Sequence, residues 1–233
     1  LSINTGAKYK EYFIEGKKPP LKLKLMFWMC NQLVLKNIKK LLGLNNCRYA
    51  LSGAAPISPE LINWYLSLGI DMREGWGMTE TAGVGTAFYS REIKLGHVGR
   101  AVNNSEVRIA DDGEILFKGP GVFCGYLNKP EQTNETLIDG WLYTGDVGEM
   151  DNYGNIKITD RKKDIIITAG GKNISPSEIE NELKFSPFVS DAVVIGDKRK
   201  FLSCLIMIDE ENVMKFAQDN DVPFSNFESL CKS

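Results

Sequence analysis

Two acidic residues of this chain stand in settings that suit nucleotide chemistry. Asp146 follows Thr144-Gly145, and a tight turn at the glycine would aim its carboxylate at the paired hydroxyls of a ribose. Glu80 follows Thr79, whose hydroxyl can donate to a phosphate oxygen, and the hard carboxylate oxygens of Glu80 suit Mg²⁺. These two sites predict contacts to a nucleotide and to its metal ion.

An aromatic residue lies directly before the second of these sites. In Gly75-Trp76-Gly77 a flat indole is flanked by bare backbone, a combination that suits a purine that stacks and bonds to main-chain groups. A tryptophan between two glycines also serves to fill a tight turn of a core, and the tripeptide alone leaves that alternative open. Together with Met78 and Thr79-Glu80, the block favours a nucleotide site.

A strand, a helix and a second strand are predicted to position these residues. A buried strand at Cys47–Leu51 precedes a helix at Pro59–Leu68, which has Ser58 as its N-cap and proline at its first position. A strand at Ile70–Arg73 then leads into the Trp76 block. This order predicts an α/β layer with loops at the strand ends. The first of these loops has small residues that leave room for a ligand, namely Ser52, Gly53, Ala54 and Ala55.

The middle of the chain changes to short alternating runs. Asp111-Asp112-Gly113 separates the runs Glu106–Ala110 and Glu114–Lys118, a strong hairpin signal. A second hairpin is expected between Trp141–Met150 and Asn155–Thr159. The segment from 106 to 159 is therefore predicted to form a small antiparallel sheet or open barrel.

Beyond Asp160 the composition shifts again, and we expect a domain boundary at Asp160 or Arg161. Ser175-Pro176-Ser177-Glu178 is a capping box that starts a helix. The segment predicts a small α+β domain, whose expected elements are a strand at Asp164–Thr168, a loop at Ala169–Ile174, a helix at Pro176–Lys184, strands at Val189–Ile195 and Phe201–Ile208, and a final helix from Glu210. We predict little regular structure for residues 1–20.

The stretch from Leu21 to Leu44 mixes apolar residues with lysines and predicts a basic amphipathic helix that ends near Gly43. One interpretation is a helix packed on the core with a solvated lysine face. The other is a peripheral contact with a membrane surface.

Composition excludes several classes of protein. The net charge of −2 gives no support to a nucleic-acid partner. The five cysteines are widely spaced without a Cys-x-x-Cys pair, which indicates reduced thiols, and no apolar run reaches the roughly 20 residues of a membrane span. We expect a cytoplasmic protein. His97 is the only histidine, so neither a hydrolase triad nor a histidine-based metal site can be built.

Four blocks in this order resemble the adenylate-forming superfamily of acyl-CoA synthetases, adenylation domains and luciferases. Those blocks are Gly75–Thr81, Tyr143–Asp146, Asp160–Asp164 and Gly170–Pro176. Ser52–Ile57, Asp139–Asp146 and the run Ile-Thr-Ala-Gly-Gly-Lys-Asn-Ile further resemble the long-chain acyl-CoA synthetases, with the bubblegum type as the nearest guess. The resemblance covers nearly the whole chain after about Leu21.

The resemblance implies an ATP-dependent fatty acid–CoA ligase with Mg²⁺ and coenzyme A, acting through acyl-AMP and then a thioester. It implies that Thr79 contacts phosphate and Glu80 holds Mg²⁺. In the nucleotide pocket, Asp146 and Arg161 would lie at the ribose and Trp76 at adenine. The residues Ser52 to Ala55 would line the nucleotide and acyl pocket. Asp160 would be the hinge of a mobile C-terminal domain, whose Lys172 would approach the CoA side.

The same resemblance implies three parts: residues 1–105 in an α/β adenylation core, 106–159 in its antiparallel subdomain, and 160–233 in the C-terminal domain. The superfamily's Ser/Thr/Gly-rich phosphate loop and its adenylation lysine have no counterpart here, so we expect the chain to be part of a longer protein. Two alternatives stay open. One is a ligase of the same superfamily for a shorter acyl, aryl or amino acid, and the other is a noncatalytic nucleotide- or acyl-binding fragment.

Overall fold

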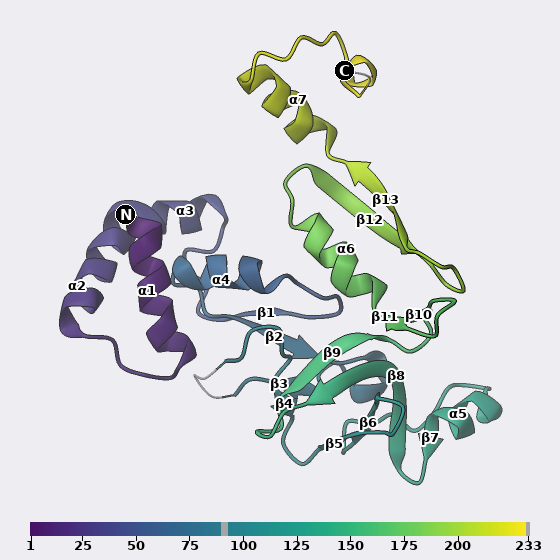
Figure 1. The fold of residues 1–233 in the computed structure, drawn as a ribbon. Helices are drawn as coiled ribbons and strands as arrows, with labels where there is room; N and C mark the ends of the chain where they lie inside the picture. Colours follow the sequence, from purple (N-terminus) through teal and green to yellow (C-terminus); the bar gives the residue numbers. More distant parts are fainter. Residues whose placement is uncertain (90–92, 232–233) are drawn as a thin grey trace. The chain divides into compact units, whose positions relative to one another are not determined.

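The computed structural model describes residues 1–89 and 93–231. The chain divides into two compact units, Leu1–Thr159 and Asp160–Ser233. The two units are described one at a time below, and Figure 1 gives their elements.

The first unit begins with helices that pack on one another. In chain order these are α1 (Ser2–Ile14), α2 (Leu21–Cys30), the π-helix η1 (Asn31–Leu35), α3 (Lys36–Leu41) and α4 (Pro59–Ser67). The prediction of little regular structure in residues 1–20 was wrong, because α1 runs beside α4. Gly6 makes this possible: a Cβ there would lie 1.9 Å from the carbonyl oxygen of Ser67. A single glycine that packs against a distant helix is only a weak signal of a helix in the sequence.

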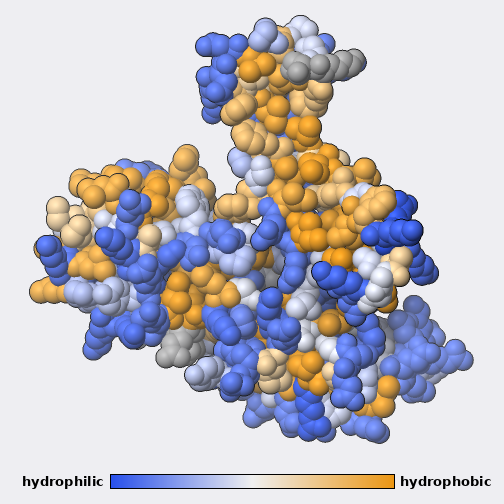
Figure 2. Space-filling model, in the orientation of Figure 1, coloured by the Kyte–Doolittle hydropathy of each residue, from blue (hydrophilic) through white to orange (hydrophobic). Residues whose placement is uncertain are grey.

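The helical stretch from Leu21 buries part of its apolar surface. Leu35 is fully buried with Leu68 and Ile70, and Phe27 and Ile38 pack against them. Large apolar side chains nonetheless remain exposed along it, including Leu21, Leu25, Trp28, Met29 and Leu33. Figure 2 shows the resulting hydrophobic surface around these helices. Some apolar residues of this stretch thus pack on the core, as one interpretation predicted, and others remain exposed.

The two predicted strands form a parallel pair, and the predicted helix, α4, connects them in the chain. β1 (Ala50–Ser52) pairs with β2 (Met72–Trp76) in the register Ala50 to Met72. The Ser58 hydroxyl accepts from the Leu61 backbone N–H at 3.1 Å and caps α4 as predicted. Two short antiparallel strands extend this sheet, β3 (Thr86–Ala87) and β4 (Arg100–Ala101).

The middle segment is an antiparallel sheet in the order β5-β6-β8-β7, with β9 on β8. Both predicted hairpins are confirmed. The described strands form an open antiparallel sheet, as predicted, and they do not close into a barrel. The sheet's elements are β5 (Glu106–Ile109), β6 (Glu114–Lys118), β7 (Leu137–Ile138), β8 (Trp141–Met150) and β9 (Ile156–Arg161), with the helix α5 (Pro130–Thr136) before β7. Its core gathers Trp76, Ile115, Phe117, Leu142 and Ile156.

Up to residue 231, where the description of the chain ends, the second unit contains two small antiparallel pairs and three helices. Helix α6 (Pro176–Lys184) has the predicted bounds and begins at the capping box. It packs on β12 (Val189–Ile195), where Ala192 and Val194 are buried. The other elements are β10 (Ile166–Ile167), β11 (Asn173–Ile174), β13 (Ser203–Ile208), α7 (Glu210–Asp219) and α8 (Phe227–Leu230). None of the helices in the described residues is long and apolar enough to cross a bilayer.

Candidate functional site

Asp146 lies in a bulge in the middle of β8. Glu114 of β6 pairs with Val147 of β8, and Leu116 of β6 pairs with Tyr143 of β8. One residue of β6 therefore lies opposite three residues of β8. The two extra residues fall at the Thr144-Gly145-Asp146 run, where Gly145 has a φ of +73°. A bulge of this kind re-aims the side chains of its strand. The turn expected at the glycine is therefore an interruption inside a strand.

Hydrogen bonds hold the residues of the bulge in place. The Gly145 N–H donates to Glu114 Oε1 at 2.9 Å, and the Thr144 hydroxyl donates to the Ile115 carbonyl oxygen at 2.7 Å. The Asp146 N–H donates to the Thr144 hydroxyl at 3.1 Å. Because two of these contacts are to the neighbouring strand and one lies within the bulge, the bulge has a defined geometry.

Trp76 and Asp146 meet inside the first unit. The indole N–H donates to Asp146 Oδ2 at 2.7 Å, and both side chains are buried. The Trp76 ring packs at a tilt on Phe117 with the ring centroids 6.0 Å apart. At Gly85 a Cβ would come within 2.5 Å of the indole. Trp76 thus fills the core, and it also fixes the carboxylate predicted for the ribose. Its contact with adenine stays a prediction.

The loop after β2 brings the phosphate and metal candidates next to this pair. Residues Thr79–Thr81 form the single turn η2, and the Thr81 hydroxyl accepts from the Met78 N–H at 3.0 Å. A Cβ at Gly77 would lie 2.2 Å from the Gly83 carbonyl oxygen, so only glycine fits there. Thr79 is exposed and Glu80 is half-buried. Both side chains can therefore be reached by a ligand.

A tyrosine that the sequence analysis did not single out contacts Glu80. The Tyr126 hydroxyl donates to Glu80 Oε1 at 2.6 Å. Burial, and after it the bond to Glu80, raise the pKa of Tyr126 above its usual value. Tyr126 is 46 residues from Glu80 in the chain, so no local pattern joins them.

The small-residue loop follows β1 next to the Trp76 block. Ser52 is the register partner of Glu74 in β2, and a Cβ at Gly53 would lie 2.9 Å from the Gly75 carbonyl oxygen. Ala54 has a φ of +67°, a left-handed conformation that residues other than glycine rarely adopt. Gly53, Ala54 and Ala55 are exposed. The two predicted ligand loops thus lie at the ends of adjacent parallel strands.

Glu74 is a second residue that the sequence analysis did not single out. Burial raises its pKa to about 7, although the backbone hydrogen bond from Gly96 opposes the shift. A carboxyl group with a pKa near neutrality beside two ligand loops is a functional-site signal in a structure. In the sequence nothing separates this strand residue from other glutamates.

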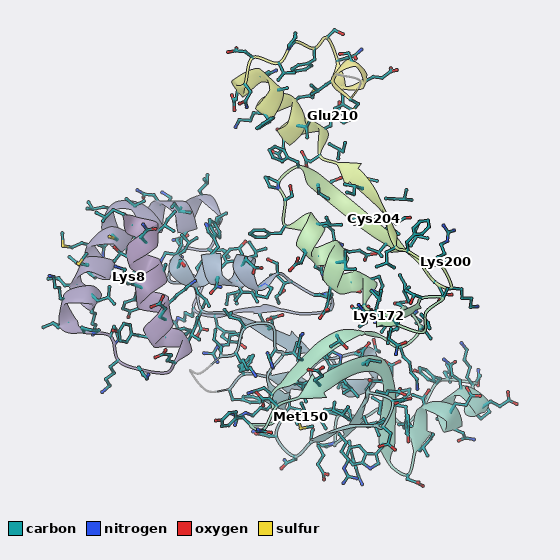
Figure 3. The ribbon with its side chains drawn as sticks, in the orientation of Figure 1. Lys8, Met150, Lys172, Lys200, Cys204 and Glu210 are labelled. Carbon is teal, nitrogen blue, oxygen red and sulfur yellow. The ribbon has the colours of Figure 1, made fainter. Side chains whose placement is uncertain are left out.

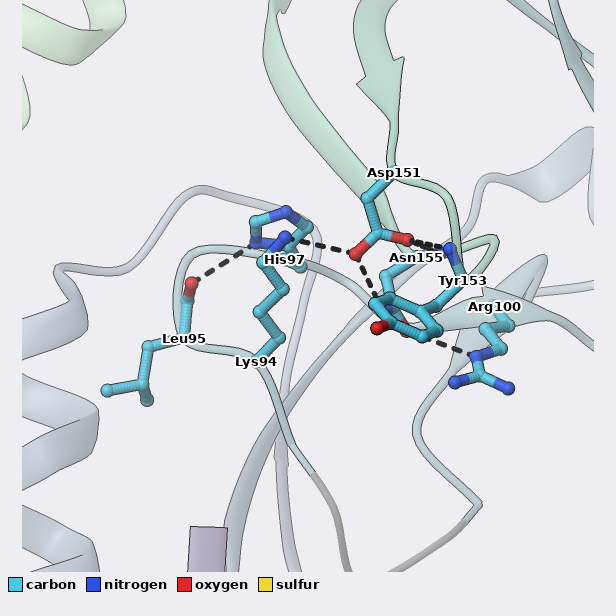
Figure 4. Close-up of polar contacts among 7 residues, drawn as sticks. All are labelled: Lys94, Leu95, His97, Arg100, Asp151, Tyr153 and Asn155. Atoms are coloured by element: carbon cyan, nitrogen blue, oxygen red, sulfur yellow. Dashed lines mark hydrogen bonds and ion pairs between the residues drawn. The ribbon is translucent and has the colours of Figure 1, made fainter. Parts of the chain in front are cut away.

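His97 lies beside a polar cluster that ties the segment after β3 to the hairpin between β8 and β9 (Figure 4). Asp151 Oδ2 accepts from the Lys94 ammonium at 3.0 Å and from the Asn155 amide at 2.9 Å. These bonds, that to Asn155 first, lower the pKa of Asp151 well below its usual range. Burial lowers the pKa of His97, whose Nδ1 lies 3.2 Å from the Leu95 carbonyl oxygen. The cluster joins the segment after β3 to this hairpin through hydrogen bonds and an ion pair.

In the second unit, Asp160 is a buried acceptor. Its Oδ2 accepts from the Ser175 hydroxyl at 2.7 Å, and its Oδ1 accepts from the Ser177 hydroxyl at 3.1 Å and from the Arg161 N–H at 2.7 Å. Ser175 also caps α6. The predicted hinge residue is thus bonded to the start of α6. Its role as a hinge stays a prediction.

The remaining candidates of the second unit are exposed. Lys172 lies between the short strands β10 and β11 (Figure 3), where its N–H donates to the Thr168 hydroxyl at 3.2 Å. Arg161 is exposed as well. Asp146 belongs to the first unit and Arg161 to the second, so their joint contact to one ribose stays a prediction.

The residues of the first unit fit a Mg²⁺ ion that arrives on a nucleotide. No group of three or more His, Cys, Asp or Glu side chains within the described ranges could hold a metal ion by itself. Magnesium commonly keeps several waters and binds through one or two carboxylates together with phosphate oxygens. The half-buried Glu80 carboxylate beside the Thr79 hydroxyl matches such a partial set of ligands.

Two family models match most of this chain. Residues 19–127 match the model of the AMP-binding enzyme, and residues 163–224 match that of the AMP-binding enzyme C-terminal domain, so together they account for most of the chain. The chain belongs to the AMP-binding enzyme family. Its fold is that of part of an adenylate-forming enzyme.

Two curated relatives match most of the chain. The long-chain fatty acid–CoA ligase FadD15 of Mycobacterium bovis is 42% identical over 94% of this chain, which spans 36% of that protein. The ligase ACSBG2 of Xenopus laevis is 40% identical over 79% of this chain and 26% of its own length. The chain therefore spans between about a quarter and about a third of the length of these relatives.

Solved structures of the same fold include a CoA synthetase with bound nucleotides. The o-succinylbenzoate CoA synthetase of Bacillus subtilis with its acyl-adenylate intermediate is 29% identical, with a TM-score of 0.67 over 78% of this chain and 42% of that one. The same enzyme with ATP and magnesium matches with a TM-score of 0.65 over 82% of this chain and 44% of that one.

Proposed function

We propose that this chain is part of an ATP-dependent long-chain fatty acid–CoA ligase. The observation that carries the proposal is the bond between Trp76 and Asp146, which holds the Gly75–Glu80 loop beside the bulge of β8. This arrangement brings candidates for the base, the ribose and the phosphates together within one unit. The names of the relatives, long-chain fatty acid–CoA ligases, support the choice of acid.

The first step joins a fatty carboxylate to the α-phosphate of ATP. A carboxylate oxygen forms the new bond to phosphorus, and pyrophosphate leaves with the electrons of the bond that breaks. The step presses like charges together, so fixed donors are needed around the phosphates. Thr79 would donate to a phosphate oxygen, and Asp146 would accept from the ribose hydroxyls. Mg²⁺ bound to the nucleotide would offset phosphate charge, with Glu80 as its protein ligand.

The second step transfers the acyl group to coenzyme A. The thiol sulfur attacks the acyl carbonyl carbon and gives up its proton to water. The bond between that carbon and the phosphate oxygen breaks, and AMP leaves with its electrons. We propose that residues 1–105 and 106–159 form the core and its subdomain, and that 160–233 form a mobile domain that pivots at Asp160 between the steps. Lys172 would then serve the second step, and Arg161 would assist at the ribose.

One assay tests this function and its alternatives. Pyrophosphate release and thioester formation would be measured with palmitate, octanoate, an aryl acid and amino acids, for this chain and for any longer polypeptide that contains it. Palmitoyl-CoA formation is the expected result. Activity with the aryl or amino acids alone would favour another ligase of the family, and nucleotide binding without turnover would favour a noncatalytic binding fragment.

We also propose a peripheral contact with an anionic membrane surface through residues 21–44. Exposed apolar side chains such as Trp28 and Leu33 lie on the same stretch as several lysines, including Lys22 and Lys36. Apolar and basic residues together suit the interface of anionic lipids. Co-sedimentation with phosphatidylserine vesicles should fall on Trp28→Ala and at high salt. Equal sedimentation with neutral vesicles would contradict the proposal.

A further inference from the structure

The residues of η2 are contacted by a second loop that precedes α5. The Phe123 N–H donates to the Glu80 carbonyl oxygen at 2.9 Å, while the Tyr126 hydroxyl donates to Glu80 Oε1 at 2.6 Å. At Gly121 a Cβ would lie 3.1 Å from the Thr81 carbonyl oxygen, so the two backbones are close. Glu80 is therefore held both at its backbone and at one carboxylate oxygen.

Tyr126 is itself fixed by its neighbours. Its ring meets the Phe123 ring edge-on, with the centroids 4.7 Å apart. Its N–H donates to the Thr133 hydroxyl at 2.9 Å, and that hydroxyl donates to the Lys129 carbonyl oxygen at 2.9 Å. A Cβ at Gly125 would lie 2.7 Å from a methyl carbon of Thr133. The phenol oxygen therefore occupies a defined position with respect to Glu80.

We propose that Tyr126 is a positioning residue that orients the Glu80 carboxylate for a nucleotide-bound divalent cation. The inference rests on the proposed function, in which Glu80 is the protein ligand of that cation. A glutamate side chain rotates about three torsions, and ordering it costs conformational entropy. The bond at Oε1 restrains those torsions before the nucleotide arrives and leaves Oε2 for the cation, since Oε2 accepts no hydrogen bond from the described residues.

A purely structural role would give a different result. If Tyr126 only joined the two loops, its removal would weaken the fold by the same amount whatever side chain stood at position 80. If it orients the Glu80 carboxylate, its removal would weaken cation binding only while that carboxylate is present. A double-mutant cycle separates the two roles.

The test uses Tyr126→Phe, Glu80→Gln and the double variant, with Tyr153→Phe as the control for an exposed tyrosine on the hairpin between β8 and β9. Mn²⁺ would be titrated into the full chain with ATP present, and free Mn²⁺ would be followed by its electron paramagnetic resonance signal. Urea unfolding of each variant reports the fold. Phenylalanine keeps the ring contact with Phe123, so the variant should remain folded.

We expect Tyr126→Phe to weaken Mn²⁺ uptake about tenfold, as for the loss of one hydrogen bond to a charged group. In the Glu80→Gln background it should have no further effect, and Tyr153→Phe should match the wild type. Unchanged uptake by Tyr126→Phe, or the same loss in both backgrounds, would overturn the inference and leave the proposed function standing. A wild-type chain that takes up no Mn²⁺ with ATP would overturn both.

Discussion

Asp146 and Lys172, two residues of the predicted site, are held in opposite ways. Asp146 is buried in a bulge of a five-stranded sheet and accepts from a core tryptophan. Lys172 is exposed between two strands of two residues each. The fold thus fixes the group predicted for the ribose within a core, and it presents the group predicted for the second step on a short hairpin. Changes at the first residue should therefore affect stability, and changes at the second should affect only chemistry.

The largest effect on stability is expected for Trp76→Phe. The change removes the indole donor to a buried carboxylate and leaves a cavity beside Phe117, which should lower the free energy of unfolding by about 2 to 4 kcal/mol. Urea denaturation measures this. Trp141→Phe is the matched control, since that ring lies half-buried under Arg108 and should cost about 1 kcal/mol or less. Equal losses in the two variants would contradict a special role for the Trp76 bond.

Glu74→Gln should alter the pH dependence of stability. The pKa of Glu74 is raised from an ordinary 4.5 to about 7, so its contribution is full below pH 4.5 and is lost as the pH rises through 7. Relative to Glu74→Gln, the wild type should lose about 1 to 3 kcal/mol between pH 4.5 and pH 8. Urea denaturation across this range is the measurement, with exposed Glu60→Gln as control. Parallel profiles for wild type and Glu74→Gln would refute the assignment.

Asp160→Asn tests how much the hydrogen bonds from Ser175 and Ser177 to Asp160 stabilise the second unit. The amide keeps one acceptor oxygen and turns the other into a donor, which opposes a hydroxyl of Ser175 or Ser177. We expect a loss of about 1 to 2 kcal/mol and faster hydrogen exchange at the start of α6. Asp164→Asn, at an exposed position, should change neither. Unchanged exchange at α6 would show that the serine contacts contribute little.

Lys172→Gln should have the smallest effect on the fold. Because the side chain is exposed, the free energy of unfolding should change by less than about 0.5 kcal/mol. Under the proposed function, thioester formation should fall by at least about tenfold while pyrophosphate release stays near wild type. Lys200→Gln, another exposed lysine of the second unit (Figure 3), is the control for loss of charge. Equal loss in both half-reactions would contradict a role limited to the second step.

Local signals in the sequence were enough for elements whose ends are set by nearby residues. Asp111-Asp112-Gly113 predicted the hairpin of β5 and β6, and Ser175-Pro176 predicted the start of α6. Helix α1 was missed because its place depends on Gly6 meeting α4, a contact between distant segments. Strand β2 runs to Trp76, three residues past the predicted end, because pairing with β1 and β3 extends it.

The residues of the candidate site also differ in whether local sequence can predict them. Glu80 and Asp146 could be singled out because short motifs surround them, whereas the role of each in binding stays a prediction. Tyr126 could not be found, since only the folded chain brings it to Glu80. The raised pKa of Glu74 likewise depends on burial, which the local sequence does not specify. Residues that act through their neighbours are therefore the ones that sequence reasoning misses.

The bulge in β8 also limits how this strand can evolve. Side chains alternate between the two faces of a strand, so adding or removing one residue turns every later side chain to the other face. The two extra residues at Thr144-Gly145-Asp146 keep that alternation intact on both sides of the interruption. Substitutions within the tripeptide can be tested one at a time, but a deletion of a single residue would move Leu142 or Val147 out of phase with the rest of the sheet. This part of the strand has to preserve its length in addition to the glycine that a φ of +73° favours.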